Sequence, residues 1–291
     1  MKDLIIGVSD GYDWNVIKYW VNSIRHCGFT GSAALVALNC DGATLAKLGE
    51  SGINVLMSGV DAQGNAVHRS EVPVIVERFF HVSNALSELG HEHRPRYVIA
   101  TDVRDVIFQT DPSQALDQLL HETWDRAVGP PNLIAASEGL RYKDEPWGDK
   151  NFHNTFGPHL HQIHREHTIY NAGTIAGTYG GVKDAAMVIF QMSLNRPIRN
   201  PDQAVYNFLL QQSPFRATTL FADPDTSAWA CQGGTLMDPS KMAQFRPKLL
   251  CPEPLFDAED GCVKTSSGRP YCLFHQWDRT RFKDEIMAKY G

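Results

Sequence analysis

The fold is decided by residues 97–108, Tyr-Val-Ile-Ala-Thr-Asp-Val-Arg-Asp-Val-Ile-Phe. Tyr97–Ala100 is a short apolar run, which is typical of a strand buried on both faces. Asp102 and Asp105 follow this run directly. Ligands of an open α/β sheet bind beyond the carboxyl ends of its strands. The stretch therefore predicts a central strand that opens into a polar site.

Strands and helices alternate on both sides of this stretch. Short apolar runs predict strands at 4–8, 33–38, 53–57 and 133–136. Apolar residues at helical spacing predict helices at 15–26, 43–49, 77–89 and 113–120. Because helices separate the strands, βαβ units are expected. We expect an α/β fold with a single Rossmann-like, mainly parallel sheet flanked by helices.

The second half of the chain is less regular. It predicts a strand and turn at 169–176, helices at 182–194 and 201–211, and a late strand at 271–274. Residues 141–168 contain Pro146, Gly148, Pro158 and many histidines, and we expect them to form a long loop with one helix at most. No repeat, low-complexity tract or linker marks a boundary. We expect 1–291 to be one domain.

Composition excludes several classes of protein. Twenty-seven basic and thirty-three acidic residues give a net charge of −6, which argues against a nucleic-acid partner. No apolar run approaches the roughly 20 residues that cross a bilayer, and the N-terminus does not resemble a signal peptide. The six cysteines are widely spaced with no Cys-x-x-Cys pair, which favours free thiols over disulfides or zinc. We expect a cytoplasmic protein.

The strongest chemical signal is the pair Asp102 and Asp105. Two carboxylates three residues apart at a strand end are able to share one divalent cation, and hard oxygen ligands suit Mg²⁺ or Mn²⁺. The structural alternative is a turn or helix cap in which Arg104 pairs with a neighbouring aspartate.

Three further segments carry weaker signals. Glycines flank a small apolar strand at 171–177, His275 and Arg279 follow the late strand, and Asp202 opens a helix. The glycines at 171–177 would allow close approach of the backbone to a ligand. His275 offers an imidazole as a metal ligand, and Arg279 offers a partner for a phosphate. Their structural alternatives are a tight turn, a structural histidine and a helix cap.

A histidine cluster gives a competing hypothesis. Its members are His153, His159, His161, His164 and His167. They would suit zinc in a hydrolase, although no His-Glu-x-x-His pattern is present. The chain also lacks the glycine-rich dinucleotide fingerprint, the P-loop and the Gly-x-Ser-x-Gly elbow, which argues against dehydrogenases, P-loop enzymes and α/β-hydrolases.

Taken in order along the chain, these segments resemble glycosyltransferases of the GT-A fold, the nucleotide-diphospho-sugar transferase superfamily. The resemblance covers about residues 4–280. It rests on Ser9-Asp10-Gly11-Tyr12 after the first strand, Arg78 on a helix, Asp105 followed by Asp111-Pro112, Asn171-x-Gly173, Asp202-Gln203 and His275.

The resemblance implies a transferase that moves a sugar from a UDP- or GDP-linked donor to a glycan or a small hydroxyl acceptor, with retention preferred over inversion. Mn²⁺ or Mg²⁺ would be held by Asp105, His275 and Asp102. The donor would be bound by Ser9, Asp10, Gly11, Tyr12, Arg78, Asp102, Arg104, Asn171, Gly173, Gln203 and Arg279. Asp202 and Glu138 are the candidate catalytic groups. Residues 1–112 would form the nucleotide-binding half and 113–291 the acceptor half, with Tyr142, Trp147 and Phe152 on the acceptor side.

One position departs from the family pattern. The usual motif is Asp-x-Asp, and Val103 stands where its first carboxylate would be. Asp102 is the residue that would take over that role. Two other functions share parts of this chemistry: a nucleotidyltransferase, and a non-catalytic protein that binds sugar nucleotides or glycans.

Overall fold

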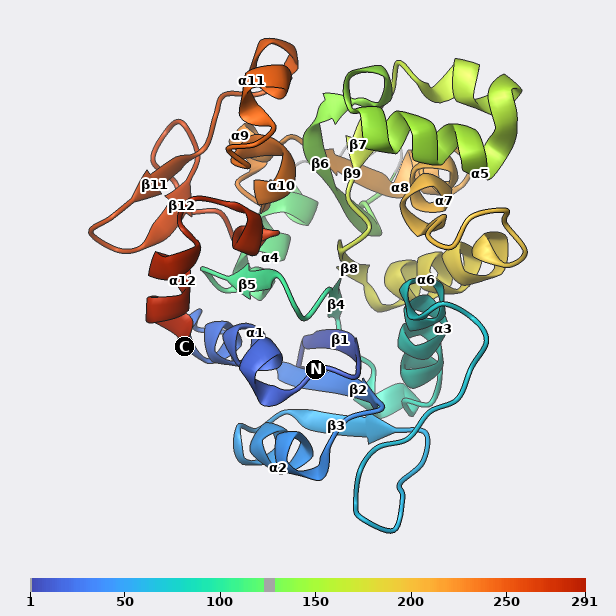
Figure 1. The fold of residues 1–291 in the computed structure, drawn as a ribbon, viewed down its shortest axis with the longest axis vertical. Coiled ribbons are helices and arrows are strands. Elements are labelled where there is room, and N and C mark those ends of the chain that lie inside the picture. Colours follow the sequence, from blue (N-terminus) through green and yellow to red (C-terminus); the bar gives the residue numbers. More distant parts are fainter. Residues whose placement is uncertain (1, 123–128) are drawn as a thin grey trace.

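A central mixed sheet organises the computed structural model, which describes residues 2–122 and 129–291 (Figure 1). Within these residues the strand order is β3-β2-β1-β4-β8-β6-β7, and β9 pairs with β6. The strands are β1 (Leu4–Asp10), β2 (Ser32–Leu38), β3 (Asn54–Met57), β4 (Tyr97–Thr101), β6 (Leu133–Arg141), β7 (Thr168–Tyr170), β8 (Thr174–Thr178) and β9 (Thr219–Ala222). Strands β1 to β4 run parallel, and β8 is antiparallel to both β4 and β6. The expected α/β fold with a mainly parallel central sheet is confirmed.

Helices cover both faces of this sheet because neighbouring strand residues point to opposite sides. Ile5 packs with one hydrophobic cluster and Ile6 with the other. The first cluster includes residues of α1 (Trp14–His26), α2 (Gly42–Glu50) and α4 (Pro112–Glu122). The second includes residues of α3 (Val74–Ser87), α6 (Tyr179–Ser193) and α7 (Asp202–Leu209).

A small second sheet joins the C-terminal part of the chain to the segment that follows β4. It has the order β10-β13-β5, from β10 (Ala230–Gln232), β13 (Leu273–His275) and β5 (Val106–Phe108). Strands β13 and β5 are antiparallel, with His275 opposite Val106. This register places His275 next to Asp105.

The C-terminal part is built from short elements. These are α8 (Phe215–Thr218), α9 (Pro224–Ser227), α10 (Gly233–Leu236), α11 (Met242–Phe245), the hairpin β11 (Leu255–Asp257) and β12 (Cys262–Lys264), and α12 (Lys283–Tyr290). Helix α12 contacts α1, so the C-terminus lies close to the first helix (Figure 1).

Residues 141–168 were expected to form a long loop with one helix at most; the helix is present as α5 (Pro146–His164), but it makes up most of the segment, so the predominance of loop was wrong. The Glu145 side chain accepts hydrogen bonds from the backbone of the first turn, and Pro146 occupies a first-turn position where proline is tolerated. The Gly157–Pro158 step forms a kink at which Gly157 has φ 80°. α5 therefore consists of two helical segments that meet at this kink.

The strand expected at 169–176 is divided in two. Residues 171–173 separate β7 from β8 and pass across the site described below. All six cysteines are free thiols, and all but Cys251 are buried. Within residues 2–122 and 129–291, no helix combines the length and the apolar character needed to cross a bilayer.

Candidate active site

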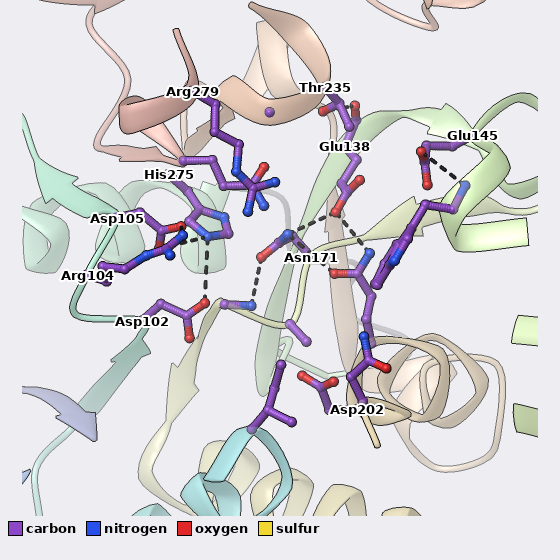
Figure 2. Close-up of a pocket in the computed structure, with 18 of the residues that line it drawn as sticks. Asp102, Arg104, Asp105, Glu138, Glu145, Asn171, Asp202, Thr235, His275 and Arg279 are labelled. Carbon is purple, nitrogen blue, oxygen red and sulfur yellow. Dashed lines mark hydrogen bonds and ion pairs between the residues drawn. The ribbon is translucent and has the colours of Figure 1, made fainter. Parts of the chain in front are cut away.

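A cavity of about 790 Å³ opens beyond the carboxyl ends of β1 and β4 (Figure 2). Its size is typical of a small-molecule site. Most of the site residues expected from the sequence line it: Asp10, Tyr12, Arg78, Asp102, Arg104, Asp105, Glu138, Asn171, Gly173, Asp202, Gln203, His275 and Arg279. The structure therefore brings together residues from both halves of the chain.

Two expected residues of the first loop do not line this cavity. Ser9 is fully buried in β1, and its Oγ has no hydrogen-bond partner. Gly11 has φ 69°, a conformation that favours glycine, and turns the chain between Asp10 and Tyr12. Gly11 therefore forms the turn and Ser9 belongs to the strand before it, while Asp10 and Tyr12 face the cavity.

Asp102, Asp105 and His275 converge at one side of the cavity (Figure 2). Nε2 of His275 lies 3.5 Å from Oδ1 of Asp105 and 3.7 Å from Oδ2 of Asp102. One ligand atom from each residue falls within 4.8 Å of the other two. Two carboxylates and an imidazole at this spacing could coordinate one divalent cation.

The orientation of His275 fits a ligand role. Its Nδ1 lies 2.7 Å from Oε1 of Gln232, whose Nε2 in turn points to the hydroxyl of Thr174 at 3.4 Å. With Nδ1–H donating to the amide oxygen, Nε2 presents its lone pair to the two carboxylates. Three electron-rich groups then face one another, which a cation would stabilise. Gln232 ends the short strand β10, and no sequence signal pointed to it.

Glycine at position 173 leaves the space that this group needs. A Cβ built there would lie 2.6 Å from Oδ2 of Asp102 and 2.9 Å from Cε1 of His275. Its backbone N–H donates to Oδ1 of Asn171 at 2.7 Å. The backbone of the Asn-x-Gly segment therefore lies directly against the side chains of the candidate metal site, where a larger residue than glycine would clash.

Asp105 is charged over the whole physiological range. Burial raises its pKa, but the positive charge of Arg104 and that of His275 in its protonated form outweigh this effect and hold the pKa well below its ordinary value. Nη2 of Arg104 lies 3.0 Å from Oδ2 of Asp105, so the expected alternative of an internal ion pair is also present. Because that ion pair uses Oδ2, Oδ1 remains directed at His275.

Val103 does not supply a polar group to the site. It borders the cavity, but its side chain is 2% exposed, lies next to Gly7 and belongs to the first hydrophobic cluster. The carboxylate of Asp102 is directed at His275 instead. Although the first aspartate lies one position earlier than in the Asp-x-Asp motif, two carboxylates, those of Asp102 and Asp105, still face His275.

Arg78 joins the candidate metal group to the other side of the cavity. It forms ion pairs with Asp102 and with Asp202, the latter at 3.0 Å. Asp202 is the first residue of α7, and the capping position belongs to Pro201, so the expected helix-cap role is wrong. Burial raises the pKa of Asp202, and the positive charge of Arg78 opposes that increase.

Glu138 forms the opposite wall with two amides (Figure 2). Its Oε1 accepts hydrogen bonds from Nδ2 of Asn171 at 2.9 Å and from Nε2 of Gln203 at 3.0 Å. Burial raises the pKa of Glu138, and the hydrogen bond from Asn171 only partly offsets this. A buried carboxyl aimed at a cavity is suited to bind sugar hydroxyls or to exchange a proton.

Several lining residues had no assigned role in the sequence. Glu145, Thr235 and Gln276 also border the cavity. Glu145 could have been recognised as a cap from the proline that follows it. Thr235 and Gln276 come from short C-terminal elements whose positions depend on long-range pairing.

The histidine cluster does not form a metal site in the described residues. His161 pairs with Asp149 at 2.7 Å, and His164 stacks on Phe152 with ring centroids 4.8 Å apart. Neither of the two groups of three potential metal ligands found in residues 2–122 and 129–291 includes them. These histidines support the kinked helix α5.

No protein-family model matches the sequence, and no curated protein matches it. Solved structures do match. A galactosyltransferase, LgtC, crystallised with donor and acceptor sugar analogs, aligns with a TM-score of 0.53 and 12% identity over 98% of this chain and 95% of that chain. An active-site variant of LgtC aligns with a TM-score of 0.52 and 12% identity, over 98% and 95% of the two chains.

The glycosyltransferase GlyE of Streptococcus pneumoniae TIGR4 aligns with a TM-score of 0.50 and 12% identity, over 99% of this chain and 63% of that chain. At this identity the likeness defines the fold. The chain adopts the GT-A fold of these glycosyltransferases, an α/β fold with a mainly parallel central sheet flanked by helices.

Proposed function

We propose that this protein is a metal-dependent glycosyltransferase that moves a sugar from a nucleoside-diphosphate donor to a hydroxyl of a glycan or a small acceptor. The observation that carries the proposal is the convergence of Asp102, Asp105 and His275 beyond β4. The same fold is found in a galactosyltransferase crystallised with donor and acceptor sugar analogs.

Mn²⁺ or Mg²⁺ would be held by Asp105, His275 and Asp102. A bound cation would supply a Lewis acid that stabilises the charge on the departing nucleoside diphosphate. Arg104 and Arg279 line the same side of the cavity and add positive charge for phosphate oxygens. This focused charge is what allows a protein of net charge −6 to bind a diphosphate.

The base and ribose of a UDP- or GDP-linked donor would lie against Asp10 and Tyr12. Tyr12 offers a ring face for stacking, and Asp10 offers a carboxylate that already accepts from Nδ2 of Asn39 at 2.8 Å. Gly11 would contribute through the turn that it forms and Ser9 through the strand that precedes this turn. Residues 1–112 as a nucleotide-binding half and 113–291 as an acceptor half remain a prediction.

The donor sugar would lie between Asp202 and Glu138, with Asn171, Gly173 and Gln203 beside it. Each carboxylate already has polar partners, Arg78 for Asp202 and two amides for Glu138. Such fixed groups suit the orientation of a sugar and the stabilisation of positive charge at its anomeric carbon. We therefore favour transfer with retention, and Glu138 is the candidate base if configuration inverts.

Of the three aromatic residues expected on the acceptor side, one lines the cavity. Tyr142 and Phe152 are buried in the core and do not line the cavity. Trp147, at the start of α5, lines the cavity and is 52% exposed. Its face is suited to a sugar ring.

The deciding experiment incubates the protein with UDP- and GDP-linked sugars and Mn²⁺ and measures release of the nucleoside diphosphate. We expect release with one donor class, loss of release with EDTA, and recovery on adding Mn²⁺. The Asp105→Asn variant should be inactive. Release of pyrophosphate from a nucleoside triphosphate and a sugar phosphate would indicate a nucleotidyltransferase instead. Donor binding without turnover on any acceptor would indicate a binding protein.

A further inference from the structure

A second cluster of potential metal ligands lies outside the cavity. It consists of His68, from the segment 58–73 between β3 and α3, and of Glu77 and His81 on α3. None of the three lines the candidate active site. Glu77 and His81 are four residues apart on one helix, a spacing that places both side chains on one face.

The three side chains point at one another. Nε2 of His68 lies 3.1 Å from both carboxylate oxygens of Glu77. Nε2 of His81 lies 3.8 Å from Oε1 of Glu77. The two imidazole rings meet edge to face, with centroids 5.1 Å apart. One ligand atom from each residue lies within 4.8 Å of the other two.

His81 is the observation that calls for a ligand. The residue is 9% exposed, and its Nε2 is buried without a hydrogen-bond partner. A buried polar atom without a partner loses its hydrogen bonds to water and gains none in return, which destabilises the folded protein. Since this atom is aimed at the carboxylate that His68 also contacts, a cation between the three groups would satisfy all of them.

We propose that His68, Glu77 and His81 bind one Zn²⁺ ion, with a fourth position open to water. Two imidazole nitrogens and one carboxylate oxygen are a zinc donor set, and zinc brings such ligands to within roughly 2.0–2.2 Å of the ion. Each imidazole Nε2 already lies 3.1–3.8 Å from a carboxylate oxygen of Glu77, and the three ligand atoms lie within 4.8 Å of one another. Small side-chain rotations complete the site.

This site differs in chemistry from the one formed by Asp102, Asp105 and His275. There, two carboxylates and one imidazole favour Mn²⁺ or Mg²⁺, which prefer oxygen. Here, two of the three donors are imidazole nitrogens, which favour Zn²⁺. The two sites are therefore distinguished by metal preference as well as by position.

The zinc would crosslink segment 58–73 to α3, the helix that carries Arg78. Elsewhere the segment is held by contacts such as Ala66 N–H to the carbonyl of Cys40 at 2.8 Å and Gly42 N–H to Oδ1 of Asn65 at 2.9 Å. Glu77 is next to Arg78 in the chain. Zinc bound at Glu77 would thus order both the segment and the first turn of α3.

The test measures Zn²⁺ binding in the Asp105→Asn background, which removes a ligand of the other site. We expect one Zn²⁺ per chain by titration calorimetry and elemental analysis. His68→Ala, Glu77→Gln and His81→Asn should each weaken binding by about 100-fold or more, since loss of even a supporting residue costs 10–100-fold. His93→Ala is the matched control, because His93 and Glu92 form an exposed histidine–glutamate pair at 3.5 Å.

A second measurement does not need the three variants of the proposed zinc ligands. Zn²⁺ should slow hydrogen exchange of backbone amides in residues 58–81 of the Asp105→Asn protein, and Mg²⁺ should not. Unchanged Zn²⁺ stoichiometry in all three ligand variants, as would occur with zinc on the α5 histidines, would overturn the proposal. So would a lack of Zn²⁺ uptake or the absence of any change in exchange within 58–81.

Discussion

Nη2 of Arg78 lies 3.0 Å from Oδ2 of Asp202, although the two residues are 124 positions apart in the chain. The same guanidinium pairs with Asp102. Arg78 therefore links α3, the end of β4 and the start of α7 at the floor of one cavity. Because burial raises the pKa of Asp202, the arginine is what favours its charged form.

Replacing Arg78 by Met should destabilise the protein and abolish transfer. Asp202 has a side chain only 6% exposed and would lose its counter-charge. Removing one partner of a buried ion pair typically costs about 3–5 kcal/mol. Denaturant unfolding at pH 7 measures this cost.

The double variant Arg78→Met/Asp202→Asn is the control. It should recover much of the stability, because the buried carboxylate of Asp202 is removed and only Asp102, whose side chain is 32% exposed, loses its ion pair; transfer should stay low. Equal destabilisation of the single and double variants would show that Arg78 acts through packing alone.

Gly173→Ala should weaken Mn²⁺ binding by about 10-fold or more. This is the loss seen when a residue that positions a metal ligand is replaced. The added methyl would lie 2.6 Å from Oδ2 of Asp102 and 2.9 Å from Cε1 of His275. Gly180→Ala is a matched control, because a Cβ there meets nothing within 4 Å. Calorimetric titration with Mn²⁺ compares the two, and equal affinities would contradict the steric role of Gly173.

Local patterns were sufficient for the framework of the sheet. Apolar runs bounded by turns located β1, β2 and β4, since strands buried on both faces leave a continuous hydrophobic signal. They also placed Asp102 and Asp105 at a strand end. The cavity residues Asp10 and Arg78 followed from the resemblance to a known family.

Long-range pairing could not be predicted in the same way. His275 reaches Asp105 only because β13 pairs with β5, and Gln232 reaches His275 because β10 pairs with β13. Strands of three residues carry almost no periodic signal. The helical share of 141–168 was underestimated for another reason: Gly157 and Pro158 lie at a kink, and Phe152 of the first helical segment stacks on His164 of the second.

Val103→Asp should not create a better metal site, even though it restores the spacing of the Asp-x-Asp motif. Val103 is 2% exposed and packs on Gly7, so a carboxylate there would be buried without a partner. We expect a loss of stability of about 3–5 kcal/mol, the cost typical of an uncompensated buried charge. Thermal unfolding measures it.

Asp102→Asn is the comparison for this substitution. It should keep the stability of the parent protein within about 1 kcal/mol, since it preserves shape, while losing Mn²⁺ affinity. A stable Val103→Asp variant with tighter Mn²⁺ binding would show that residue 103, and not Asp102, belongs to the metal group.

Glu138→Gln should stabilise the protein at neutral pH and have less effect in acid. Burial raises the folded-state pKa of Glu138 above its ordinary value of 4.5, so the folded protein holds this proton more tightly than the unfolded chain. Between the two pKa values the folded state binds more protons, and its stability falls as pH rises. The favourable contribution is complete below pH 4.5 and is lost as pH passes the folded-state pKa.

Glutamine removes this pH dependence because it has no proton to lose. Its Oε1 still accepts from Asn171 and Gln203, so the hydrogen bonds are retained. The stability gain of the variant should therefore increase from pH 5 to pH 8, with each pKa unit corresponding to about 1.4 kcal/mol. Denaturant unfolding across this range, with the exposed Glu50→Gln as control, measures the gain. A gain that is constant with pH would mean that Glu138 has the same pKa in the folded and unfolded states, and would remove it as the candidate base.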